Sequence, residues 1–186
     1  MGIELGRITP EEYKEAPESG IVVVLDNIRS AHNVGSAFRS SDSFKVDKLW
    51  VCGICATPPS AEIRKTALGA EESVPWEYSR DTLDAVRKLK EEGYTVISVE
   101  QTAHSVSLEK FKPVGGKFAL IFGNEVDGVS QEVVDASDMS LEIPQFGTKH
   151  SLNVSVAVGV VLWHLTSDRL NSQATAGNHL PGNGLQ

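Results

Sequence analysis

The stretch GIVVVLDN, residues 20–27, decides the fold. Its apolar and mostly β-branched core, residues 21–25, stands between a glycine and an Asp-Asn pair, which is typical of a short strand buried on both faces in a parallel sheet. The next segment places four buried-type residues at helical spacing: Val34, Ala37, Phe38 and Ser41. Asn33 is available as the N-cap of that helix. A strand followed by a helix is the first unit of an α/β fold.

The same alternation continues along the chain. Further strands are predicted at 49–52, 94–99, 118–122 and 139–143, and a helix that Asp81 caps ends at Gly93. Residues 151–165 are rich in valine, but the run is too long for an ordinary buried strand. We expect a buried helix there, capped by Ser151. The pattern predicts a parallel α/β sheet flanked by helices.

Length and composition indicate one globular domain. The chain has 186 residues, 40% of them hydrophobic, which is enough for a core without disulfide or metal. We expect a short N-terminal segment at 1–20, one domain at 21–170, and a disordered tail at 171–186 that is rich in Gly, Asn, Ser and Ala. Apolar stretches fall short of the ~20 residues that cross a bilayer, no export signal precedes residue 21, and only Cys52 and Cys55 are present. We therefore expect a cytoplasmic protein without a membrane role.

The net charge of −8 argues against nucleic-acid binding by bulk charge alone. The charge is segregated, however. Residues 27–48 carry four basic and two acidic side chains, whereas residues 127–142 carry five carboxylates and no base. The first of these segments is the better candidate for a surface that faces anions.

Three segments combine polar residues with glycine where predicted strands end, which is where open α/β sheets bind ligands. They are NIRSAHNVGSAFRSSD at 27–42, FGNEVDG at 122–128 and IPQFGTKHSLNVS at 143–155. Each could be an ordinary turn if it stood alone. Their order and spacing together carry the functional argument.

In this order the three segments resemble the signature motifs of the SpoU or TrmH family of the SPOUT superfamily, the S-adenosylmethionine-dependent RNA ribose 2'-O-methyltransferases. The resemblance extends from about residue 21 to residue 165, and its most specific part is Ser151-Leu152-Asn153-Val154. It implies a parallel sheet of about six strands whose C-terminal part forms a deep trefoil knot. It also implies a homodimer whose active site takes residues from both subunits, and a reaction that needs no metal.

The resemblance assigns roles to residues by their motif positions. Arg39 matches the arginine that acts at the ribose hydroxyl, either as the base or by gripping a phosphate and orienting the sugar. Four further positions match the catalytic set: Asn33, Glu125, Ser151 and Asn153. The donor is expected to contact backbone at Gly123, Ile143 and Leu152, close to Gly128, with Glu100 bordering the pocket.

RNA recognition is the least determined part of the prediction, because the motifs concern the methyl donor and the hydroxyl. Candidates for phosphate contacts are Arg29, Arg64, Lys65 and Lys149. Transfer RNA is the first expectation for the substrate, ribosomal RNA is the alternative, and a non-catalytic RNA-binding member of the family is a third possibility.

A rival hypothesis starts from Cys52 and Cys55, which have the C-x-x-C spacing of thioredoxin-like redox sites. In such sites the first cysteine opens a helix. Here Pro58 and Pro59 follow closely, which a helix through that point does not tolerate. A zinc site would need two more ligands, and no second cysteine pair exists. We expect two buried or half-buried thiols at the end of a strand.

Overall fold

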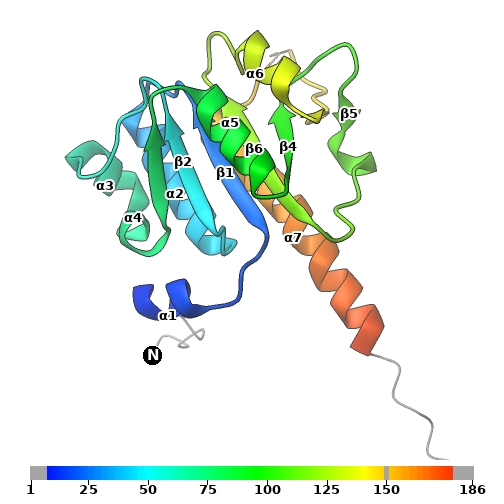
Figure 1. The fold of residues 1–186 in the computed structure, drawn as a ribbon, viewed down its shortest axis with the longest axis horizontal. Helices are drawn as coiled ribbons and strands as arrows, with labels where there is room; N and C mark the ends of the chain where they lie inside the picture. Colours follow the sequence, from blue (N-terminus) through cyan, green and yellow to red (C-terminus); the bar gives the residue numbers. More distant parts are fainter. Residues whose placement is uncertain (1–7, 149–150, 178–186) are drawn as a thin grey trace, which may run out of the picture.

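The protein is built around one parallel sheet of seven strands, shown by a computed structural model that describes residues 8–148 and 151–177 (Figure 1). The sheet order is β3-β2-β1-β6-β4-β7-β5, and all of its strand pairs are parallel. The strands are β1 (Ile21–Asp26), β2 (Lys48–Cys52), β3 (Trp76–Ser79), β4 (Tyr94–Val99), β5 (Val106–Ser107), β6 (Lys117–Gly123) and β7 (Met139–Glu142). The predicted parallel α/β fold is confirmed, with seven strands in place of about six.

Helices cover both faces of this sheet and give the molecule three layers. They are α1 (Pro10–Glu15), α2 (Ala31–Ser43), α3 (Ala61–Ala67), α4 (Ala70–Ser73), α5 (Thr82–Glu91), η1 (Leu108–Lys110), α6 (Gln131–Ala136) and α7 (Val154–Gly177). No helix within the described ranges is both long and apolar enough to cross a membrane.

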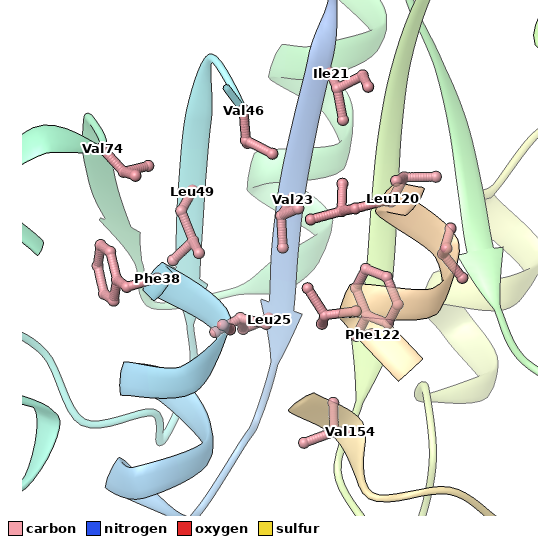
Figure 2. Close-up of a cluster of buried hydrophobic side chains, with 14 of the residues drawn as sticks. Ile21, Val23, Leu25, Phe38, Val46, Leu49, Val74, Leu120, Phe122 and Val154 are labelled. Carbon is pink, nitrogen blue, oxygen red and sulfur yellow. The ribbon is translucent and has the colours of Figure 1, made fainter. Parts of the chain in front are cut away.

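Alternate residues of β1 enter two separate cores, because successive side chains of a strand point to opposite faces. Val23 and Leu25 pack against α2 and α7, in the cluster that Figure 2 shows around Phe38 and Phe122. Val22 and Val24 pack on the other face against α5 and α6. All six residues of β1 are buried. This explains why its sequence is continuously apolar rather than alternating.

The sheet order places β6 between β1 and β4, with β7 beyond β4. The carboxyl ends of these four strands therefore lie side by side. The segments that follow them contain all three of the sequence motifs.

The N-terminal segment packs on the sheet domain through α1. The buried hydroxyl of Tyr13 donates hydrogen bonds to the backbone oxygens of Ser41 (3.2 Å) and Val46 (2.8 Å). Both acceptors belong to the end of α2 and the turn after it. α1 is thus fastened to the helix that carries the first motif.

Two predicted helix caps are wrong. Ser30, not Asn33, caps α2. Its backbone is extended, and its hydroxyl oxygen accepts the N–H of Asn33 at 3.3 Å. α7 begins at Val154, and Asn153, not Ser151, accepts the N–H of Ser155 at 2.9 Å. In each case a polar side chain two or three residues away lies just before the first helical residue or accepts the first free N–H.

The predicted tail also needs correction. α7 continues to Gly177, so residues 171–177 are helical. The first glycine after Gly159 is Gly177, and no proline lies between them, so no residue interrupts the helix earlier. Residues 178–186 lie outside the described residues.

Candidate active site

A cavity of about 640 Å³ opens at the carboxyl ends of β4, β6 and β7, beside the start of α7. Seven of the residues that the sequence analysis assigned to the site line it: Glu100, Gly123, Glu125, Gly128, Ile143, Ser151 and Leu152. The structure therefore brings the second and third motifs to one cavity, and it lies where parallel sheets bind ligands.

Glycine is required at both ends of the loop that follows β6. A Cβ on Gly123 would lie 1.9 Å from the backbone carbonyl carbon of Gly128, so the two ends of the loop pass in direct backbone contact. Gly128 has a φ of +68°, which L side chains rarely adopt. Between them Asn124 accepts the N–H groups of Val126 (3.0 Å) and Asp127 (2.9 Å) with its side-chain oxygen. The loop is therefore an ordered turn.

One asparagine joins the three motifs. Asn33, on α2, donates its side-chain N–H to the carboxylate of Glu125 and accepts a hydrogen bond from the side chain of Asn153 at 3.2 Å. These partners are 92 and 120 residues away in the sequence. Since Asn33 is not occupied as a helix cap, its amide is available for both bonds. The result is a hydrogen-bonded row of polar groups that begins at Glu125 in the cavity lining.

Arg39 does not lie in this cavity. It is exposed on α2 and lines a separate groove of about 470 Å³ together with Lys65, Ser155 and Val156. Arg39 lies six positions after Asn33 in the helix, or about 9 Å further along the axis. Within the described part of the chain, its guanidinium forms no ion pair or hydrogen bond. The first motif is thus divided between two surfaces.

The cavity has an acidic lining. Every charged side chain that the described residues contribute to it is a carboxylate: Glu100, Glu125, Asp127 and Glu142. Such a lining favours a cationic ligand and disfavours phosphate. Groups that bind the phosphates of a nucleic acid must therefore come from outside the cavity.

The predicted RNA contacts divide into three groups. Arg29 is exposed and has no charged partner among the residues described here. Arg64 lies 3.5 Å from Glu72 and Lys65 lies 2.7 Å from Glu62, so both are already ion-paired. Lys149 lies outside the described residues. Arg80, which was not among the predicted contacts, is a further exposed arginine just after β3.

Both cysteines are buried at the end of β2, as predicted. Burial raises the pKa of Cys52 to about 12 and that of Cys55 to about 11. The sulfur of Cys55 accepts the N–H of Ile28 at 3.0 Å. A redox cysteine needs a lowered pKa and access to solvent, and these thiols have neither. In the described ranges, no group of three or more His, Cys, Asp or Glu side chains could hold a metal ion.

Comparison with known proteins gives a consistent picture. The model of the SpoU rRNA methylase family matches residues 20–163. The 23S rRNA (guanosine-2'-O-)-methyltransferase RlmB of Vibrio vulnificus is 31% identical over 156 residues, which are 83% of this chain and 62% of that protein. The tRNA (guanosine(18)-2'-O)-methyltransferase of Aquifex aeolicus is 29% identical over 85% of this chain and 74% of its own length.

Solved structures show the same fold. The TrmH/SpoU tRNA modifying enzyme of A. aeolicus superposes with a TM-score of 0.77 at 25% identity, covering 90% of this chain and 85% of that one. The AdoMet-bound rRNA methyltransferase of Sinorhizobium meliloti gives a TM-score of 0.75 at 25% identity, covering 89% and 61%. The chain spans about three fifths of the length of the RlmB protein it matches.

Proposed function

Since this chain belongs to the SpoU methylase family, we propose that it transfers a methyl group from S-adenosylmethionine to a ribose 2'-hydroxyl of RNA. The observation that carries the proposal is the hydrogen-bonded row Glu125–Asn33–Asn153, whose Glu125 lines an acidic cavity. It joins the three family motifs at one point. Relatives that carry the name of either an rRNA or a tRNA 2'-O-methyltransferase support the reaction class.

The cavity suits the methyl donor in size and in charge. Its volume of about 640 Å³ is within the range of small-molecule sites, and its carboxylates complement a sulfonium cation. Backbone at Gly123, Ile143 and Leu152 would hold the donor, with Gly128 allowing close approach and Glu100 at the border. When bound, the donor supplies an electrophilic methyl whose carbon–sulfur bond breaks as the carbon–oxygen bond forms.

The acceptor side of the reaction needs a positively charged group that the cavity lacks. A ribose hydroxyl is a weak nucleophile until its proton is drawn away, so it must be positioned and its charge stabilised. Arg39 is the motif residue for this task, yet in one copy of the chain it faces a different groove. A second copy can supply it.

The exposed face of α7 supports a homodimer. Val156, Val160 and Trp163 lie at helical spacing and are 50%, 38% and 59% exposed. Val156 also borders the Arg39 groove. We propose that a second copy covers this apolar stripe and that the partner subunit's Arg39 reaches the cavity.

Mixing two inactive variants tests this arrangement. Arg39→Ala and Asn153→Ala should each lose methyl transfer. Refolded together, they should recover about one quarter of the wild-type activity, because half of the dimers then carry one site with both residues intact. An arginine that acts within its own chain predicts no recovery. Sedimentation of a Val160→Asp variant should show a monomer.

For the substrate we favour transfer RNA, because the relative that acts on it is matched over 74% of its length against 62% for the rRNA enzyme. The test is transfer of labelled methyl from S-adenosylmethionine to purified tRNA and rRNA, followed by nuclease digestion. Label in a cleavage-resistant dinucleotide identifies 2'-O-methylation. Arg39→Ala should abolish it, whereas Arg87→Ala, another exposed helix arginine, should not. Folded protein that labels neither RNA would contradict the proposal.

A further inference from the structure

The second half of the loop after β6, and the two residues that follow it, have all their backbone donors in hydrogen bonds. Five successive N–H groups, those of residues 126–130, form hydrogen bonds within the protein. Asn124 accepts the first three, two with its side chain and the third, from Gly128, with its backbone oxygen at 3.0 Å. The last two belong to Val129 and Ser130, and carboxylates from outside the loop accept them.

These two carboxylates come from the strands on either side of β6. Glu100 follows β4 and accepts the N–H of Val129 at 3.0 Å. Asp26 ends β1 and accepts the N–H of Ser130 at 3.0 Å. Because β6 lies between β1 and β4 in the sheet, the chain that leaves β6 is held from both sides by consecutive backbone groups.

Each carboxylate is itself held in place. Asp26 is 1% exposed and also accepts the hydroxyl of Thr82 at 2.6 Å and the side-chain N–H of Asn27 at 2.9 Å. Glu100 also accepts the N–H of Gln101 at 3.0 Å. Gly128 leaves the space that Glu100 needs, since a Cβ there would lie 2.2 Å from a Glu100 carboxylate oxygen. Charged acceptors make stronger hydrogen bonds than neutral ones.

We propose that Glu100 and Asp26 are positioning residues that fix the 123–128 loop in its ligand-binding shape before the methyl donor arrives. This inference rests on the proposed function for the identity of the donor. The loop supplies six residues of the cavity lining. Because the loop is already ordered, donor binding does not have to order it. We call the two bonds from Val129 to Glu100 and from Ser130 to Asp26 the clasp. Loss of the clasp lowers the fraction of protein with an ordered loop and weakens the apparent affinity for the donor in the same proportion.

Hydrogen–deuterium exchange tests the clasp without any ligand. Glu100→Ala should speed exchange of the backbone amides of 124–130 by roughly ten-fold or more, because the loop then opens more often. Asp138→Ala is the matched control: Asp138 also accepts a backbone N–H, from Val96 at 2.7 Å, outside the cavity lining. Its loss should leave exchange at 124–130 unchanged. Equal exchange in both variants would overturn the proposal.

Donor binding provides the second readout. Glu100→Ala should raise both the Kd and the KM for S-adenosylmethionine by roughly ten-fold, with kcat at saturation within about two-fold, because saturating donor selects the ordered loop. Glu100→Gln keeps an oxygen that can accept from Val129 and should recover most of the loss. A glutamine variant that keeps wild-type exchange at 124–130 but binds the donor as weakly as the alanine variant would instead show that the carboxylate contacts the donor, which contradicts a positioning role.

Ser130→Pro tests the Asp26 side while Asp26 itself is kept. Ser130 has a φ of −58°, which proline adopts, and its side chain makes no cap hydrogen bond. The substitution removes the N–H that Asp26 accepts and places the proline ring against that carboxylate, so exchange at 124–129 and the Kd for the donor should both rise. If they do not, Asp26 has no part in the clasp. Wild-type protein that fails to bind S-adenosylmethionine would refute the proposed function, while the exchange experiment would still decide the clasp.

Discussion

Asn33 occupies a position where no other common side chain would serve as well. It must donate to a carboxylate and accept from an amide at once, and a primary amide offers both groups within one small side chain. Its partners Glu125 and Asn153 belong to the loops after β6 and before α7. The relative placement of these two loops therefore depends on one residue of α2.

Replacing Asn33 by aspartate isolates the donor function. Asn33→Asp keeps an acceptor for Asn153, but at neutral pH it places a second carboxylate against Glu125, and like charges repel. We expect methyl transfer at pH 8 to fall at least ten-fold while the protein remains folded. Steady-state rates and a circular dichroism melt check this. Asn33→Asp activity equal to wild type would show that the bond to Glu125 has no role in the reaction.

The buried thiols make a pH-dependent contribution to stability. Burial raises the pKa of Cys52 to about 12 and that of Cys55 to about 11, from 9.0. The folded protein thus holds these protons more tightly than the unfolded chain does. Their contribution is complete below about pH 9 and is lost as pH rises through 11 and 12.

We therefore expect the free energy of unfolding in urea to fall between pH 8.5 and pH 10.5, and to fall less in Cys52→Ala. Burial raises the pKa of Tyr94 to about 12, so part of the fall should persist in that variant. Iodoacetamide at pH 8 should leave native protein unmodified and active. Rapid alkylation without unfolding would contradict the buried, protonated state.

The motifs predicted that Glu125, Asn33 and Asn153 belong to one site, and the structure joins these three side chains by hydrogen bonds. The separation of Arg39 from them, on a different surface, was not predicted. Arg39 reaches a separate groove because it lies six positions beyond Asn33 on the same helix. Motif spacing alone does not say which surface of a helix meets which neighbour.

The α2 and α3 helices pack so closely at Gly35 that there is no room for a Cβ there. A Cβ on Gly35 would lie 2.2 Å from the hydroxyl oxygen of Thr66 and 2.3 Å from the backbone oxygen of Ile63. A side chain could rotate away from such a Cβ, but the backbone oxygen of Ile63 can move only if α3 moves. The position of α2, and of the site residues on it, therefore depends on this contact.

Gly35→Ala should destabilise the protein by about 1 to 3 kcal/mol through overpacking, and it should reduce activity because α2 shifts. Gly159→Ala is the matched control. Its Cβ would have only the Ser40 hydroxyl within 4 Å, at 3.9 Å, so it should stabilise α7 by about 0.5 to 1 kcal/mol. Urea unfolding of both variants measures the difference, and a stabilised Gly35→Ala would show that α3 yields easily.

Long apolar elements were predictable and short ones were not. The strand expected at 94–99 has the bounds of β4, and those at 118–122 and 139–143 match β6 and β7 within one residue. β3 and β5 were missed, because four and two residues carry little periodicity of their own. Their pairing with β2 and β7 forms them, and such long-range partners are not visible in a local pattern.

At the scale of the whole molecule, the charges are arranged so that donor and RNA meet different surfaces. The cavity is lined by carboxylates, while Arg29, Arg39 and Arg80 are exposed outside it. A chain of net charge −8 repels RNA at long range. Local contacts between arginines and phosphates must overcome that repulsion.

Raising monovalent salt from 50 to 200 mM should therefore weaken RNA binding by at least ten-fold and change the Kd for S-adenosylmethionine by less than two-fold. Arg80→Ala should lower the slope of log Kd against log salt by about one, which is the contribution of one phosphate contact. Filter binding at four salt concentrations measures both. An RNA affinity independent of salt would mean that recognition does not use the backbone.

The order of the strands also determines when each strand can pair during translation. β6 lies between β1 and β4, yet it leaves the ribosome after both. Until residue 123 has emerged, β1, β2 and β3 can pair with one another, but the β1 edge that faces β6 is open and β4 has neither of its neighbours. Such open edges are prone to pair with the wrong chain. The row that joins Asn33 to Glu125 is completed only by Asn153. A nascent chain therefore gains its binding site only after residue 153 has been made, when all the strands of the sheet are already present.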